Sequence, residues 1–290
     1  VNFIYGLRFA QASMLFPHYL EGDYSARALP VRFKEAPAIK KPGKRAAEEE
    51  KARYVKMRKE QNLSVQFLEV MLSLRESLDA QGAAHRPLLA ALDVSLCPFG
   101  KLRTVSLSNG NRTIFKAPLR GIQLVARRRK DARLCFPPPA GSRRKYDPNK
   151  FSPEQVRQDE TIPWREARIH LGGAWRWVRY KEVNGVLWQR GSGRRKLRLL
   201  AIAPQPYKLS ARSRINYRQP AYLLCTDTQG PIKPPLRQAQ GREPVERLIQ
   251  VYFDRWQIEV NHRDQKSLFG VGQTQVHSKN AIPRQPAFAV

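Results

Sequence analysis

The chain has 290 residues, of which 41% are hydrophobic, so it can build one large core or two smaller ones, and global disorder is excluded. Lys and Arg number 53 against 24 Asp and Glu, which leaves a net charge of +29 at pH 7. So many positive charges repel one another unless an anionic partner neutralises them. Nucleic acid is the usual partner, and an anionic membrane is the rival. No apolar run reaches the length of a transmembrane helix, so we expect no membrane partner.

The first 45 residues contain apolar and loop-like stretches. Residues 1–17 are apolar and predict a long strand or a strand pair, with Pro17 as its stop. Residues 21–45 are rich in Pro and basic residues, which favours a loop. The widely spaced Cys97, Cys135 and Cys225 form no metal-binding or paired motif and indicate free thiols in a reducing cytoplasm.

Two helices are predicted next. Residues 46–62 combine strong helix formers with mixed charges, which is typical of a solvated helix. Ser64 is placed to cap a second helix, whose apolar residues recur at helical spacing as far as Leu78, and Gly82 closes it. Apolar runs at 88–92, ending before Asp93, and at 122–126 then predict buried strands. Strand, helix and strand in alternation favour an α/β fold.

The sequence pattern changes at about Pro137, after which strand-like segments predominate. Residues 175–188 alternate around Asn184-Gly185, a dipeptide typical of a hairpin turn, and two further strands follow in "KLRLLAIAP" and "PAYLLCTD". We interpret Trp175, Trp177 and Trp188 as hairpin packing. A linker leads to Pro244, which suits the first turn of a last helix.

The last helix carries an unusual polar pattern. In an unbroken helix, Tyr252, Arg255, Glu259 and Lys266 fall within a sector of about 60°. Apolar residues flank the start of that sector, so this face should turn toward the protein and line a cleft. The simpler alternative is a partly buried helix with an Arg255–Glu259 ion pair.

The order Tyr-x2-Arg-x3-Glu-x6-Lys resembles the Y-R-E-K signature of DDE transposases encoded by bacterial insertion sequences. The segments "RWQIE", "GVGQTQVHSKNAI", "NRTIFKAPLRGIQLVARRRKDARL", "GLRFAQASMLFP" and "ARALPVRFKEAP" are also similar to that family. The resemblance implies a ribonuclease H-like mixed sheet with flanking helices and a β-rich insertion before the last helix. Residues 1–136 would be the first part of the core, 137–228 the insertion, and 229–290 a linker and the catalytic helix.

In that family, carboxylates hold two divalent ions, Mg²⁺ or Mn²⁺, at a phosphodiester. The resemblance makes Asp93 and Glu259 catalytic metal ligands, gives Arg255 and Lys266 contacts with DNA phosphates, and places Tyr252 at a phosphate or a displaced base. Asp93 has a second interpretation as a turn or helix cap, because it directly follows a strand. The chain also departs from the family here, since Val94 stands where the family commonly has Gly. The first carboxylate should end a strand before Val1, and Asp23 suits a turn instead. We therefore expect a chain cut at both ends and inactive in cleavage.

DNA contacts are expected from the basic runs, above all from Arg127, Arg128, Arg129 and Lys130. The resemblance implies element ends and target DNA as partners, a cytoplasmic location at the bacterial nucleoid, and leaves open a homodimer on DNA. Three hypotheses remain: a truncated DDE transposase, a non-catalytic nucleic-acid-binding protein, and a degenerate remnant without activity. Whether Asp93 and Glu259 converge in the fold would discriminate between them.

Overall fold

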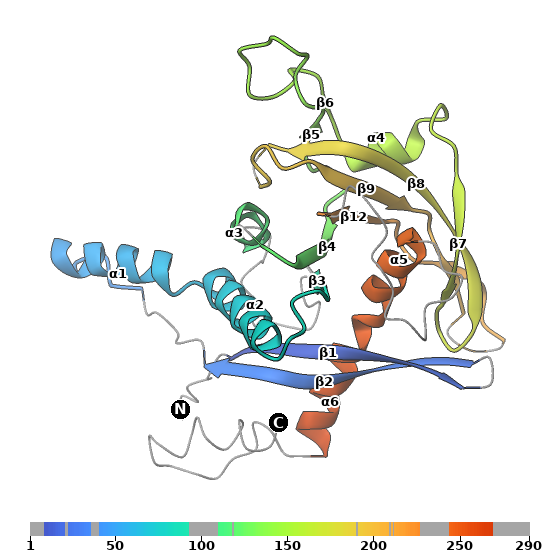
Figure 1. Ribbon diagram of the computed structural model, residues 1–290, viewed down its shortest axis with the longest axis horizontal. Coiled ribbons are helices and arrows are strands. Elements are labelled where there is room, and N and C mark those ends of the chain that lie inside the picture. Colours follow the sequence, from blue (N-terminus) through green and yellow to red (C-terminus); the bar gives the residue numbers. More distant parts are fainter. Residues whose placement is uncertain are drawn as a thin grey trace. The chain divides into compact units, whose positions relative to one another are not determined.

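The computed structural model describes residues 9–20, 23–35, 41–92, 110–117, 119–189, 191–208, 210, 212–226 and 244–268. It is an α/β protein with a mixed sheet and several helices, as the sequence predicted. The chain divides into two compact units (Figure 1). Unit 1 comprises Val1–Ala84 and Asp254–Val290, and unit 2 comprises His85–Phe253.

Unit 1 contains a long hairpin. Strand β1 (Phe9–Leu20) pairs antiparallel with β2 (Asp23–Glu35) along its whole length. Two predictions are therefore wrong: Pro17 lies inside β1 opposite Ala26, and residues 23–35 form a strand rather than a loop. A two-stranded ribbon leaves alternate N–H groups without a partner strand, so it can accept a proline that a central strand would reject. Every second residue from Tyr24 to Ala28 is buried, which is the strand period.

The helices of unit 1 follow the predictions closely. Helix α1 (Glu48–Glu60) buries none of its residues, as expected for a solvated helix. Helix α2 (Leu63–Ala80) lies alongside the hairpin (Figure 1) and ends before Gly82, whose φ of 78° suits glycine. Its cap is Asn62 rather than Ser64, because the Asn62 carboxamide accepts from the backbone N–H groups of Ser64 and Val65 at 3.0 and 3.1 Å.

Unit 2 is built on an eight-stranded sheet in the order β3-β4-β12-β9-β8-β5-β6, with β7 also paired to β8. Its strands are β3 (Leu88–Leu92), β4 (Ile122–Arg128), β5 (Leu134–Cys135), β6 (Lys150–Phe151), β7 (Arg165–His170), β8 (Trp175–Trp188), β9 (Leu197–Ile202) and β12 (Ala221–Cys225). Strands β3 and β4 are parallel and flank helix α3 (Gly110–Lys116) in the sequence. The other pairs are antiparallel.

The strands predicted at 88–92, 122–126, 196–204 and 220–227 are confirmed; the structure places the last two at Leu197–Ile202 and Ala221–Cys225. The strands β7, β8, β9 and β12 all lie in the segment 137–228 that was expected as an insertion. They continue the same hydrogen-bonded sheet as β3 and β4. Two short strands, β10 (Pro206–Tyr207) and β11 (Asn216–Tyr217), form a separate pair, and α4 (Pro153–Gln158) follows β6.

The hairpin turn predicted at Asn184-Gly185 is wrong. Strand β8 runs through both residues, and its register against β9 shifts by one residue between Val183 and Val186. Gly185, with a φ of 75°, is the left-handed residue of this bulge. The turn lies instead at Gly172-Gly173, where φ is positive at both residues, as a type I′ hairpin between β7 and β8 requires.

Helix α5 (Pro244–Asp254) begins at Pro244, as predicted, and supplies the core of unit 2. Its Val245, Leu248 and Ile249 are buried in one cluster with sheet residues such as Leu200 and Leu223. Their spacing of three and four places them on one helical face, and burying that face on the sheet stabilises both elements.

Candidate nucleic-acid interface

The predicted unbroken last helix is divided in the structure. Helix α5 ends at Asp254, and α6 (Trp256–Ser267) begins after Arg255. The backbone of Arg255 stays helical, with φ −49° and ψ −29°, but its carbonyl accepts from the Ile258 N–H, three residues on. Tyr252 belongs to unit 2, whereas Arg255, Glu259 and Lys266 belong to unit 1. Their common face therefore stays a prediction.

Tyr252 is a core residue of unit 2. It is 6% exposed, lies in the same cluster as Leu248 and Ile249, and its ring meets Phe253 edge-on with centroids 5.3 Å apart. Little of this side chain is accessible to DNA in the described structure. The apolar start of the predicted helical face is confirmed, and its burial accounts for Tyr252 without a ligand.

Arg255 and Glu259 form an ion pair with Nη1 and Oε1 3.1 Å apart. The Arg255 side chain is 15% exposed and that of Glu259 is 42% exposed. This is the i,i+4 pair that the simpler alternative predicted, and i,i+4 pairs on helices contribute only about 0.3–0.5 kcal/mol. Lys266 lies in the last turns of α6, and its side chain is outside what the structure describes.

Helix α6 is held to the hairpin of unit 1 by polar side chains. Gln11 of β1 donates to Asn261 of α6 at 3.1 Å, and Gln265 of α6 donates to Gln11 at 3.5 Å. The hydroxyl of Tyr24 donates to Asp254. Asp23, the first residue of β2, accepts from the Tyr24 N–H at 2.8 Å and pairs with Leu20 of β1; residues 21–22 lie outside the described residues, so the turn role of Asp23 stays a prediction.

The metal site remains an expectation. Asp93 lies outside the described residues, so its approach to Glu259 stays a prediction. Within the described ranges, no group of three or more His, Cys, Asp and Glu could hold a metal ion. The only described member of the expected ligand pair, Glu259, directs a carboxylate oxygen to Arg255. The described residues therefore do not fit a two-metal centre by themselves.

The basic run at the end of β4 has a mixed environment. Arg128 is 8% exposed and stacks on the Trp188 ring, with its guanidinium carbon 3.4 Å from the centroid. Burial lowers the pKa of Arg128 to about 10. Arg129 is bonded to both carboxylate oxygens of Asp131, at 2.9 and 2.8 Å. Arg127 is half-buried and Lys130 exposed. Of these four predicted DNA contacts, Arg128 is the one placed in the interior.

The outer face of the β7–β8 hairpin carries a basic and aromatic surface that the sequence analysis missed. Trp177 is 64% exposed and lies opposite Arg168. Arg179 follows two residues later on the same face, where it lies opposite the exposed Glu166. The interpretation of Trp177 as hairpin packing is therefore wrong, whereas Trp188 is buried against Phe115, with ring centroids 5.8 Å apart. The alternation in "WRWVR" could have revealed this face once its register was known.

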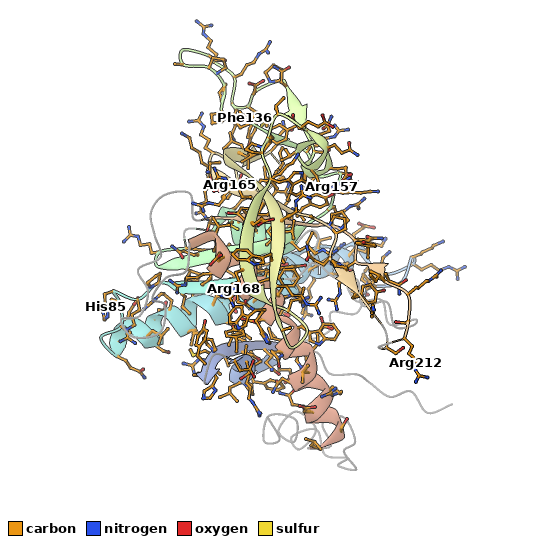
Figure 2. All side chains as sticks on the ribbon, turned by 90° about the vertical axis from the view of Figure 1, so that its right-hand side faces the viewer. His85, Phe136, Arg157, Arg165, Arg168 and Arg212 are labelled. Carbon is orange, nitrogen blue, oxygen red and sulfur yellow. The ribbon has the colours of Figure 1, made fainter. Side chains whose placement is uncertain are left out.

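Cation–π contacts hold this surface in place. The Arg168 guanidinium lies 5.4 Å from the Trp175 ring centroid, and that of Arg179 lies 5.0 Å from the Trp164 centroid. We name the surface of Arg168, Trp177 and Arg179 the hairpin face; Figure 2 labels its Arg168. Guanidinium groups beside an exposed indole suit a partner with phosphates and flat bases.

Comparisons with protein-family models and with curated proteins found no match for this chain. In the described part of the chain, none of the helices combines the length and the apolar character that crossing a bilayer requires.

Proposed function

We propose that this chain binds DNA and is a DDE-type transposase chain with a ribonuclease H-like core. The Tyr-Arg-Glu-Lys spacing and the similar segments support the family, and the net charge of +29 supports a polyanionic partner. The order of elements in unit 2 supports the fold. A parallel pair, β3 and β4, is followed by antiparallel strands and then by α5, which is the succession that the resemblance implies.

The observation that carries the DNA-binding proposal is the hairpin face. Its arginines are exposed, and they flank an indole that is 64% exposed on a regular strand pair. An exposed indole can stack on a flat base, and arginine prefers phosphate and aromatic partners. Electrostatic contacts of this kind supply affinity without sequence preference.

A second candidate function, DNA binding without catalysis, is favoured by the Arg255–Glu259 ion pair. The Arg255 guanidinium holds Oε1 of Glu259 and partly neutralises its charge, which weakens the carboxylate as a metal ligand while leaving Oε2 available. The two candidates share the DNA partner and differ in whether Glu259 takes part in cleavage.

Fluorescence anisotropy with labelled duplex DNA tests the shared part. We expect little sequence preference and an affinity that falls steeply with salt, because bound phosphates release counterions. Arg168→Ala with Arg179→Ala should lower the salt slope by about two, since each lost phosphate contact lowers it by about one. Arg58→Ala with Lys59→Ala on the solvated α1 removes the same charge and should change the slope less. No anisotropy change on adding the wild-type chain to duplex DNA at low salt would refute DNA binding.

A cleavage assay with Mg²⁺ or Mn²⁺ tests whether this chain is itself catalytic. The non-catalytic candidate predicts no nicking of duplex DNA by this chain. Metal-dependent nicking that Glu259→Gln abolishes, with duplex affinity unchanged, would establish the catalytic candidate and refute the other.

A further inference from the structure

A second basic and aromatic site lies elsewhere in unit 2, where the β4–β5 connection meets β6 and α4. It is an open pocket of about 460 Å³, and Lys130, Arg133 and Lys150 are among its lining residues, together with Phe151. No ion pair involving these three cations is present in the described ranges. Two carboxylates, Asp131 and Glu154, also line the pocket.

Both carboxylates of the pocket are already neutralised by other arginines. Asp131 is held by two hydrogen bonds from Arg129, which lower the pKa of Asp131. Glu154 accepts from Arg157 at 2.5 Å and from the Tyr222 hydroxyl, and the Arg157 bond is the main cause of its lowered pKa. Because these acids stay ionised and paired, the three remaining cations leave the pocket suited to an anion.

Phe151, which lines the pocket, is in contact with a second aromatic ring. The ring of Phe136, which directly follows β5, lies 5.1 Å from that of Phe151, with 36° between the ring planes. Phe136 is 45% exposed, although a packing residue of this size is usually buried. The pocket shares no lining residue with the hairpin face, and Figure 2 shows Phe136 well apart from Arg168.

We propose that this pocket binds one nucleotide of single-stranded nucleic acid, with a phosphate held by Lys130, Arg133 and Lys150 and the adjacent base stacked on Phe136. The partner is single-stranded because a base in a duplex already stacks on its neighbours and does not present its ring face. Lysines and arginine supply phosphate contacts without reading the base, so the pocket accepts any sequence. This inference rests on the proposed DNA binding and names a second substrate form for the same unit.

Anisotropy titrations with fluorescein-labelled oligo-dT and with a duplex test the proposal. Phe136→Ala should weaken oligo-dT binding about fivefold or more through lost stacking and leave duplex binding unchanged. Phe16→Ala is the matched control, since Phe16 is also 45% exposed but lies in unit 1. The triple variant Lys130→Ala, Arg133→Ala, Lys150→Ala should weaken oligo-dT binding more than the triple variant Lys56→Ala, Arg58→Ala, Lys59→Ala on α1. Unchanged thermal midpoints would show that the variants fold.

If Phe136→Ala and Phe16→Ala change the affinity for oligo-dT equally, the stacking site is refuted. If the two triple variants change that affinity equally, the phosphate site is refuted. Calorimetry with thymidine monophosphate and with inorganic phosphate identifies the source of the phosphate. Tighter binding of the nucleotide, lost in Phe136→Ala, supports the proposal, whereas equal binding of the two ligands overturns it. Salt-dependent duplex binding together with unchanged oligo-dT binding in the variants would refute only the single-strand pocket. Absence of binding to both oligo-dT and duplex DNA would refute the proposed function as well.

Discussion

Among single residues, the Glu154 carboxylate is the hub of a polar cluster in unit 2. Arg157 and Tyr222 both donate to it, and Tyr222 is 3% exposed. Burial, with the bond to Glu154 second, raises the pKa of Tyr222 to about 12. The phenol therefore stays protonated, and able to donate, throughout the neutral range.

Glu154→Gln should reduce the free energy of unfolding at neutral pH by about 1 kcal/mol, because it replaces charged hydrogen bonds at a side chain that is 26% exposed. The folded pKa of Glu154 is lowered, so this stabilisation is present above the unfolded pKa and is lost as pH falls through the folded pKa. The difference in the free energy of unfolding between wild type and Glu154→Gln should therefore become smaller at acidic pH. Urea unfolding at about pH 7 and about pH 3 measures it, with the exposed Glu160→Gln as control. A pH-independent difference would contradict the assignment.

At the scale of elements, β7 is an edge strand that α5 covers with side chains. Gln250 accepts from the His170 N–H at 2.8 Å and donates to the His170 carbonyl at 3.0 Å. Glu246 accepts from the Arg168 N–H at 2.8 Å. These contacts imitate a neighbouring strand and keep the edge from pairing with other chains.

Gln250→Ala should destabilise unit 2 by about 2 kcal/mol, because two backbone groups of His170 lose their partners. Hydrogen exchange should accelerate at the His170 amide and stay unchanged at β7 amides that bond to β8. Gln257→Ala on α6 removes a comparable carboxamide and should leave both the stability of unit 2 and this exchange as they are. Unchanged protection of His170 in Gln250→Ala would show that the helix does not cover the edge.

For the whole molecule, the net charge of +29 has two opposite consequences in salt. Like charges repel one another within the folded chain, and ions screen that repulsion. The same ions compete for DNA phosphates.

Raising sodium chloride from about 0.05 M to about 0.5 M should therefore increase the thermal unfolding midpoint of the free protein by a few degrees while weakening DNA binding. Calorimetric melts and anisotropy titrations in the same buffers measure the two effects. Potassium chloride should give the same shift, since screening depends on ionic strength rather than on the ion. A midpoint that falls with either salt would mean that specific ion pairs outweigh the net repulsion.

The sequence by itself determined the elements whose signals are local. The charged run of α1, the apolar spacing of α2, the short apolar runs of β3, β4, β9 and β12, and the start of α5 at Pro244 were all predictable, because periodicity and helix-start chemistry act within a few residues. The Arg255–Glu259 pair was predictable for the same reason. The metal site, with Asp93 outside the described residues, remains a prediction.

Only the tertiary structure decided features that depend on a partner segment. Asn184-Gly185 has the composition of a turn, but the pairing of β8 with β9 makes it a β-bulge within the strand. Residues 23–35 form a strand because β1 pairs with them. Tyr252 and Trp177 are both aromatic, but α5 buries the first and the β7–β8 register exposes the second. A strand has two faces that its composition alone does not distinguish, so only the packing of the sheet decides which residues face solvent and a ligand.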